Sequence, residues 1–365
     1  GNIITDNRIH DGGIVYHAAV GIWVGQASRN TIAHNEISDL FYTAISAGWT
    51  WGYGPNQCKG NIIEDNHLHD LGKDLLSDMG GIYTLGMQPG TLIRRNLIHD
   101  VSAFTYGGWG IYPDEGSSEM VIEDNIVYRC KNSLFHQHYG KENIVRNNIF
   151  AFGREGQLQR TRMEPHRSFT FEGNIIYWTQ GELLSSNWSD DKYLFDRNVY
   201  FNAAGGPVKF AQWTFEQWKA RGQDKTSVIA DPLFADPAKF DFTLKPESPA
   251  LKLGFKPIDL SGVGPRPEFR RGCESRSTNN ERHSPWRSSG SLDSSPSGSP
   301  CRCGSSRSSG SPPECPARAR SSARTRTQTR SRRNRITKRA RRGVAPRRAW
   351  KLRRFRIEWF SSGRS

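Results

Sequence analysis

Hydrophobic and polar positions alternate along the chain in a unit that recurs many times. Each unit has an apolar residue, two variable positions, an asparagine, one variable position and a second apolar residue, as in IITDNRI, TIAHNEI and VIEDNIV. The recurring asparagines are Asn7, Asn35, Asn66, Asn96, Asn125, Asn148, Asn174 and Asn198. Their successive spacings of 28, 31, 30, 29, 23, 26 and 24 residues are typical of solenoids, in which each repeat stacks on the next.

Each unit also contains a second short apolar run, such as GIWVG, GIYTLG or GIYPDEG. The runs often alternate in polarity and are bounded by Gly, Asn and Asp, so the pattern predicts strands rather than helices. Two or three strands per coil, with coils stacked about 4.8 Å apart, predict an all-β fold, a right-handed single-stranded parallel β-helix. WD40 propellers have longer periods, and leucine-rich repeats need an LxxLxL pattern that the units lack.

The asparagine falls at the same turn of every coil, and we expect its side chains to stack into a hydrogen-bonded ladder. Three coils also carry a His-Asp pair at a fixed distance after the asparagine, at positions 10–11, 69–70 and 99–100. Because these pairs recur with the coil, we interpret them as turn residues rather than as a site.

Aligning the second strands predicts which side chains face outward. The predicted inward column contains Ile22, Ile45, Ile82, Ile111 and Leu134. By strand alternation, the following outward column contains Trp23, Ser46, Tyr83, Tyr112 and Phe135. Two positions further on, the same face holds Gly25, Gly48, Leu85, Asp114 and Gln137. The alignment therefore places Asp114 beside a row of aromatic side chains, where a sugar ring could lie.

Charge divides the chain into two unlike parts. The whole chain has 51 Lys+Arg and 36 Asp+Glu, and residues 266–365 contain 27 and 6 of them, which leaves 24 basic and 30 acidic residues in 1–265. We therefore expect a β-helix domain over 1–265 and a low-complexity, disordered Arg/Ser/Pro-rich tail over 266–365. The tail would bind polyanions non-specifically, so its charge does not indicate a specific nucleic-acid partner. Its abrupt onset also fits a reading-frame change.

Other sequence features bear on membrane insertion, export, metal binding and the C-terminal end of the domain. No run of about 18 apolar residues predicts a membrane span, and no signal peptide precedes the first repeat. The chain opens within a repeat unit, so we expect upstream coils, and any export signal, to be missing from it. Cys58 and Cys130 have no zinc-ligand spacing, and neither a metal nor another cofactor is predicted. The segment QWTFEQWKARG predicts a short helix within a C-terminal cap of about 211–265.

Several motifs resemble those of a known family. LSDMGGIYTLG, GGWGIYPDEGSS, FHQHYGKENIVRNNIFAFGREGQLQRTR and SSNWSD resemble the β-helical glycoside hydrolases of family 141 and related pectate-lyase-like proteins. The resemblance covers about residues 1–265, including VIADPLFADPAKFDFTLKPESPALKLGF, which is similar to the closing segment of many secreted β-helices. It implies hydrolysis of a glycosidic bond in a polysaccharide, and a secreted or periplasmic location in the relatives.

Glycoside hydrolysis needs two carboxyl groups, and three are candidates here: Asp78, Asp114 and Glu115. A straight strand would separate Asp78 from Asp114 by roughly 7 × 3.3 Å, beyond the roughly 5–9.5 Å that glycosidases use. We therefore expect the chain to fold back at Gly80-Gly81, or Asp78 to pair across a corner. Adjacent residues point to opposite faces, so one of Asp114 and Glu115 would be buried against a turn.

The candidate substrate-binding residues are Tyr83, Trp109, Tyr112, His136, His138, Arg160, Arg162 and Trp188. The two histidines are expected on one side of a strand, opposite Phe135 and Gln137, where they would hydrogen-bond sugar hydroxyls or tune a neighbouring group, or be buried in the core. The two arginines would hold an acidic sugar or pair with carboxylates of the domain. Each tryptophan suits either the core or a sugar platform.

Three functions fit this pattern. The first is a glycoside hydrolase with a polysaccharide or oligosaccharide as its partner. The second is a polysaccharide lyase acting on uronic acids, usually with Ca²⁺ and an Arg or Lys base. The third is a carbohydrate-binding solenoid without catalysis, which would keep the aromatic column and need neither Asp78 nor Asp114. The sequence leaves the sugar, its linkage and the oligomeric state open.

Overall fold

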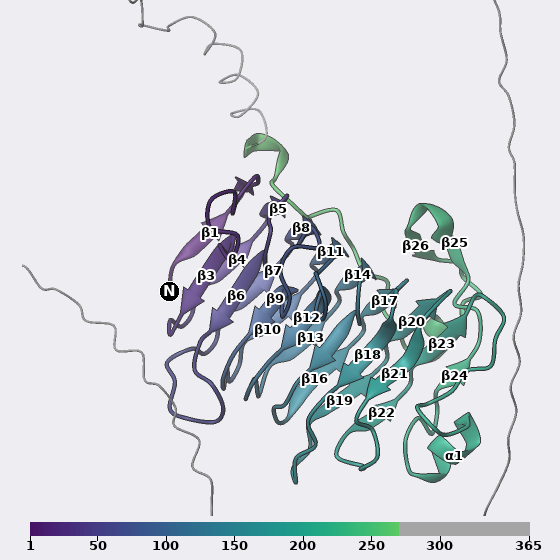
Figure 1. The fold of residues 1–365 in the computed structure, drawn as a ribbon. Coiled ribbons are helices and arrows are strands. Elements are labelled where there is room, and N and C mark those ends of the chain that lie inside the picture. Colours follow the sequence, from purple (N-terminus) through teal and green to yellow (C-terminus); the bar gives the residue numbers. More distant parts are fainter. Residues whose placement is uncertain (270–365) are drawn as a thin grey trace, which may run out of the picture. The chain divides into compact units, whose positions relative to one another are not determined.

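A computed structural model of the chain describes residues 1–269, and the predicted tail lies outside the described residues from position 270 onward. Within the described range the chain winds into a parallel β-helix, which confirms the predicted fold class (Figure 1). Each full coil contributes one strand to each of three parallel sheets.

The bounds of the strands follow the repeat. The first sheet contains, in spatial order, β1 (Ile3–Thr5), β4 (Thr31–Ala33), β7 (Ile62–Glu64), β10 (Leu92–Arg94), β13 (Val121–Glu123), β16 (Asn143–Arg146), β19 (Phe169–Glu172) and β22 (Leu194–Asp196). The second contains β2 (Arg8–Ile9), β5 (Glu36–Ser38), β8 (His67–Leu71), β11 (Leu97–Val101), β14 (Ile126–Cys130), β17 (Ile149–Ala151), β20 (Ile175–Trp178), β23 (Val199–Asn202) and β24 (Val228–Ile229). The third contains β3 (Ile22–Gly25), β6 (Ile45–Gly48), β9 (Gly80–Thr84), β12 (Trp109–Pro113), β15 (Phe135–Gln137), β18 (Gly156–Arg160) and β21 (Glu182–Ser186).

The predicted asparagine ladder joins the first and second sheets. Asn96 is fully buried, and its Nδ2 donates to Asn125 Oδ1 (3.0 Å) and to the carbonyl of Ile63 (2.9 Å). The same contact links each ladder asparagine to the next from Asn7 to Asn198. Because every amide bridges two coils, the ladder satisfies backbone groups that would otherwise be buried without partners.

Aliphatic and aromatic columns fill the interior. Ile22, Ile45, Ile82 and Ile111 pair in register, as predicted. The next member of this column is Phe135 rather than Leu134, followed by Leu158 and Leu184. The predicted register of the fifth strand was therefore wrong by one residue, and a slip of one residue moves every side chain to the opposite face.

The register of β15 decides which of its side chains reach the surface. Phe135 and Gln137 are fully buried instead of facing outward. His136 takes the outward position and stacks on Tyr112, with ring centroids 4.7 Å apart and planes 7° apart. Leu134 is also buried, just before the strand begins. Two successive apolar residues made both registers compatible with the sequence pattern.

The C-terminal part closes one end of the solenoid. Helix α1 (Phe215–Ala220) has a capping box between Thr214 and Gln217, which confirms the predicted helix. Its Trp218 is fully buried and donates from Nε1 to Asp224 Oδ2 (2.7 Å). Beyond it come β25 (Phe234–Asp236), the 3-10 turn η1 (Pro237–Lys239), β26 (Asp241–Leu244) and α2 (Pro249–Lys252).

A segment of residues 256–266 then runs back along the coils. The amide of Lys256 donates to Asn147 Oδ1 (2.8 Å), the carbonyl of Gly262 contacts His34 Nδ1 (2.7 Å), and Arg266 pairs with Asp6 in the first coil. The segment therefore connects the sixth coil to the first, and Arg266 belongs to this described part of the fold.

The remaining sequence expectations concern turns, cysteines and membranes. In the three His-Asp pairs each histidine contacts the next aspartate, whose backbone is left-handed. The pairs at 69–70 and 99–100 lie within β8 and β11, so the prediction that they are turn residues was wrong for these two. Cys58 and Cys130 are buried and free. Within residues 1–269, no helix has both the length and the apolar composition needed to cross a membrane.

Replacing Asn96 by alanine tests the ladder. The substitution leaves the Ile63 carbonyl and the Asn66 amide without their buried partners, so the free energy of unfolding should fall by about 2–5 kcal/mol. Urea unfolding followed by circular dichroism measures the change. Asn7→Ala, at the exposed end of the ladder, should cost about 1 kcal/mol or less, because water replaces its lost hydrogen bonds. Equal losses in the two variants would contradict a cooperative, buried ladder.

Candidate active site

A hollow of about 320 Å³ lies on the outer face of the third sheet. Its walls come from the loop before β9, strand β12 and the turn after it, and the strands β15 and β18 with their following residues. The lining residues are Asp78, Tyr106, Trp109, Tyr112, Asp114, Glu115, Asn132, His136, His138, Gln159 and Thr161. The structure thus brings all three predicted carboxyl groups to one place, together with four of the predicted binding residues.

Two stacked tyrosines hold the two aspartates. Tyr83 and Tyr112 occupy neighbouring positions of β9 and β12, with ring centroids 4.8 Å apart and planes 12° apart. The Tyr112 hydroxyl donates to Asp78 Oδ1 (3.1 Å), and the Tyr83 hydroxyl donates to Asp114 Oδ2 (2.6 Å). The stacked rings therefore bring the two carboxyl groups to the same part of the hollow, close enough for the charge of Asp114 to act on the pKa of Asp78.

The backbone positions Asp78 at a bend, not through a fold-back at the glycines. Gly80 and Gly81 are extended residues of β9, so the expected reversal there was wrong. Asp78 itself has a left-handed φ of 58°. Its amide donates to the Tyr106 carbonyl (3.1 Å), and its carbonyl accepts from the Tyr42 hydroxyl (2.8 Å). The Tyr112 hydroxyl reaches Asp78 from the neighbouring strand β12, so Asp78 and Asp114 are held by two stacked tyrosines without a reversal of β9.

Gly107 is required beside this bend. It has a φ of 101°, and a Cβ at this position would lie 2.8 Å from the backbone nitrogen of Asp78. Any side chain there would both strain the backbone and push against Asp78.

Burial and charge set the protonation of Asp78. Burial raises its pKa above the ordinary value, and the negative charge of Asp114 raises it further, against the lowering effect of the Tyr112 hydrogen bond. Burial also raises the pKa of Tyr112 well above its usual range, with the charges of Asp114 and Asp78 adding to the effect. The tyrosine therefore stays a hydrogen-bond donor. A carboxyl group whose pKa is raised is better suited to donate a proton.

Two histidines and Trp109 form the opposite side of the hollow. Thr161 Oγ1 contacts both His136 Nε2 (3.0 Å) and His138 Nδ1 (2.7 Å). Burial lowers the pKa of His136 well below its ordinary value, so this imidazole is neutral. Its Nδ1 is buried and has no hydrogen-bond partner. Trp109 packs against the His136 ring at 4.2 Å and donates from Nε1 to Gln159 Oε1 (2.7 Å).

Four predicted binding residues lie outside the lining. Tyr83 is buried behind it and contacts Asp114. Arg160 is fully buried, with its guanidinium paired to Asp190 (2.8 Å), and it faces inward beside Gln137. Trp188 is a core residue that packs on aromatic rings and donates to the Ser185 carbonyl. Arg162 is exposed and lies over the Tyr139 ring at 4.2 Å.

Sequence reasoning missed Tyr106, Asn132, Gln159 and Thr161. Gln159 pairs with His136 and faces outward, whereas the neighbouring Arg160 faces inward. The signal was present in GQLQR, because alternation from the apolar Leu158 places Gln159 outside. The alignment of the second strands ended one strand earlier, so this alternation was not applied to GQLQR.

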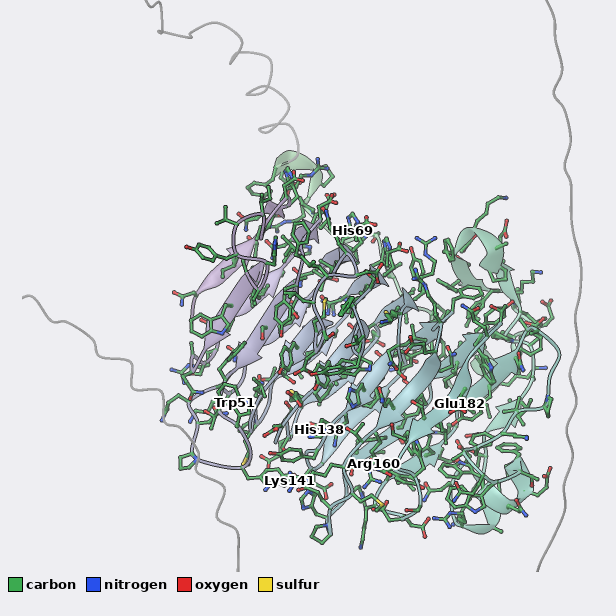
Figure 2. All side chains as sticks on the ribbon, viewed as in Figure 1. Trp51, His69, His138, Lys141, Arg160 and Glu182 are labelled. Carbon is green, nitrogen blue, oxygen red and sulfur yellow. The ribbon has the colours of Figure 1, made fainter. Side chains whose placement is uncertain are left out.

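Figure 2 shows how the labelled side chains are distributed along the solenoid. His138 lies near the middle of the view, with Trp51 toward the N-terminal coils and Glu182 toward the C-terminal coils. His69, from one of the His-Asp pairs, lies at the opposite edge. In residues 1–269, no group of three or more His, Cys, Asp or Glu side chains is arranged to hold a metal ion.

Comparison with known proteins gives a family match over residues 2–198, to the family described as "Right handed beta helix region". A curated relative, "Uncharacterized protein YwoF" of Bacillus subtilis, is 27% identical over 208 residues, which are 53% of this chain and 38% of that protein. The chain thus spans well under half the length of this relative.

Three solved structures overlap with the chain in part. One is a "Glycoside hydrolase", 26% identical, covering 40% of this chain and 25% of its own, with a TM-score of 0.33. Another is a mannuronic acid specific polysaccharide family 6 lyase from human gut microbiota, 14% identical, covering 77% and 68% with a TM-score of 0.43. A complex of XylC with xylose is 14% identical, covering 57% and 39% with a TM-score of 0.36.

Asp78→Asn should stabilise the protein at neutral pH. Because the fold raises the pKa of Asp78, it disfavours the charged form. This cost is absent well below the ordinary value of 3.8 and complete once the pH exceeds the raised value. Asparagine tolerates the left-handed backbone and removes the charge. Denaturant unfolding should give equal stabilities for parent and variant near pH 3 and a more stable variant at pH 7.

Asp74→Asn provides the matched control, since Asp74 is exposed and also left-handed. Its unfolding free energy should follow that of the parent at both pH values. An Asp78→Asn variant less stable than the parent at pH 7 would show that the carboxylate is not disfavoured in the pocket.

Proposed function

Because the chain belongs to the right-handed β-helix family, we propose that it is a carbohydrate-active β-helix protein that hydrolyses a glycosidic bond of a polysaccharide. The observation that carries the proposal is the pair of aspartates held by two stacked tyrosine hydroxyls in an aromatic-walled hollow. Two carboxyl groups that line the same hollow can act on opposite sides of a glycosidic bond, one as the acid and the other as the nucleophile or base. The motif resemblance described above supports the same reaction.

The two aspartates receive different roles. Asp78, whose pKa is raised, gives its proton to the glycosidic oxygen as the bond from that oxygen to the anomeric carbon breaks. Asp114 either attacks the anomeric carbon or removes a proton from the attacking water, and the water supplies the new hydroxyl group. If Asp114 is the nucleophile, water then breaks its bond to the anomeric carbon and gives a proton back to Asp78; if Asp114 is the base, it keeps the proton of the water, and exchange with solvent restores both groups. Either route consumes one water. Glu115, which accepts from the Tyr139 hydroxyl (3.0 Å), lies at the edge of the same hollow.

The pocket favours hydrolysis over elimination. A lyase needs a positive charge near the uronate carboxylate and a base at the neighbouring carbon. Among the described residues that line the hollow there is no lysine or arginine. The nearby Arg160 is buried and already paired with Asp190. The carboxyl groups of Asp114 and Glu115 in the lining would instead repel a uronic acid, so we expect a neutral sugar at the bond that is cleaved.

Substituting each aspartate tests the assignment. Asp78→Asn and Asp114→Asn should each lower kcat on a responsive polysaccharide by about 10²–10⁴-fold, measured as new reducing ends released by the full chain. Glu182→Gln, on strand β21 of the same sheet and outside the hollow, is the matched control and should leave kcat unchanged.

The products distinguish the competing functions. Reducing ends without absorbance near 235 nm support hydrolysis, whereas unsaturated products would replace it with elimination. Retention of polysaccharide without any product would reduce the function to binding. Full turnover by Asp114→Asn would remove Asp114 from the reaction.

A further inference from the structure

The aromatic column of the hollow continues beyond it toward the N-terminal coils. In the third sheet, Trp23, Ser46 and Tyr83 occupy successive positions of one outward column that reaches Tyr112 in the hollow and continues with His136. Ser46 is small and leaves a gap in the column. The Trp49 ring fills this gap and donates from Nε1 to Ser46 Oγ (3.0 Å).

Neighbouring ring centroids along this column are close throughout. Trp23 and Trp49 are 6.1 Å apart, Trp49 and Tyr83 are 6.2 Å apart, and Tyr83 and Tyr112 are 4.8 Å apart. Trp51 stands edge-on to Trp49 at 5.7 Å. The rings therefore form one continuous row of contacts from the exposed indoles to the hollow, in which Tyr83 is buried.

The exposure of these rings changes along the column. Trp109 and Tyr112 in the hollow are each 3% exposed, whereas Trp23 is 62% and Trp51 is 59% exposed. Trp23 and Trp51 both contact Trp49, and exposed indoles gathered in this way typically mark a binding site. Their continuity with the hollow indicates that the same ligand covers both.

Trp23 lies flat on its strand. A Cβ built on Gly25 would lie 2.7 Å and 2.8 Å from the Cζ2 and Cη2 atoms of the Trp23 indole. Because Gly25 has no side chain, the six-membered ring of the indole lies close to the strand at that position while most of the Trp23 side chain stays exposed. A flat, supported aromatic face is suited to stack on the apolar face of a sugar ring.

Trp49 adopts a costly backbone conformation to reach its place. Its φ is 75°, in the left-handed region that bulky residues rarely enter. Such strain persists where the surrounding structure requires it, and it is concentrated at functional sites. Here it directs the indole over Ser46, between the exposed Trp23 and the buried Tyr83.

We propose that Trp23, Trp49 and Trp51 form an extended binding platform for the same saccharide chain whose bond lies at Asp78 and Asp114. The inference rests on the proposed function and specifies the substrate as a polymer that runs along the solenoid axis. From β3 to β12 the column spans three coil spacings, or about 14 Å. That length exceeds the length of a disaccharide, so a disaccharide cannot occupy the platform and the hollow together.

Chain-length dependence of the kinetics tests the platform. In the full chain, Trp23→Ala and Trp51→Ala should each raise KM for a polysaccharide by about 2–10-fold and leave its kcat unchanged. KM for a disaccharide should not change. Gly25→Val keeps every tryptophan but displaces the Trp23 ring, so it should raise KM in the same way. Tyr16→Ala, which removes an aromatic side chain that is 81% exposed elsewhere, is the control and should match the parent.

Retention in gels that contain a neutral glycan such as xylan, or an acidic one such as alginate, separates failure of the platform from failure of the proposed reaction. Weaker retention of the tryptophan variants by a glycan that the parent binds but does not cleave would support the platform and overturn hydrolysis. Cleavage with unchanged KM and retention in both tryptophan variants would overturn the platform alone. Absence of both binding and cleavage across the panel would overturn both. Thermal unfolding of each variant confirms that it is folded.

Discussion

The spacing between hydrogen-bonded parallel strands is the constraint on which the rest of this protein depends. Backbone hydrogen bonds fix successive coils about 4.8 Å apart, and the amides from Asn7 to Asn198 repeat at that interval in the turn between two sheets. Every residue type placed at one position of the coil consequently stacks on its counterpart. Isoleucines stack into the core, asparagines into a ladder and tyrosines into a pair.

The same stacking creates the candidate site. Tyr83 and Tyr112 are neighbours only because β9 and β12 pair in register. Each ring then directs its hydroxyl to a different carboxyl group, which holds Asp78 and Asp114 near each other in a partly dry hollow. The fold thus places two carboxyl groups close together, and the charge of Asp114 adds to burial in raising the pKa of Asp78.

The fold class, the ladder and the position of Asp114 could be read from the repeat because they depend on periodicity alone. The side chains of β15 and β18 could not, since Leu134 and Phe135 are both apolar and only pairing with Ile111 decides which one enters the column. In the observed register Gln159 and Thr161 line the hollow, and Arg160 is buried and paired with Asp190. Trp188 was ambiguous for a similar reason, because an indole suits a core as well as a surface.

The sequence by itself determined that short strands recur with a buried asparagine in every coil, because apolar residues and asparagines repeat at one position of every coil. Only the tertiary structure decided which carboxyl groups meet. Asp78 lies at a left-handed bend and Asp114 lies beyond the end of a strand in the next coil, so their proximity depends on the length and direction of the Tyr112 side chain. Such a contact across coils leaves no periodic trace in the sequence, whereas the backbone repeat that supports it does.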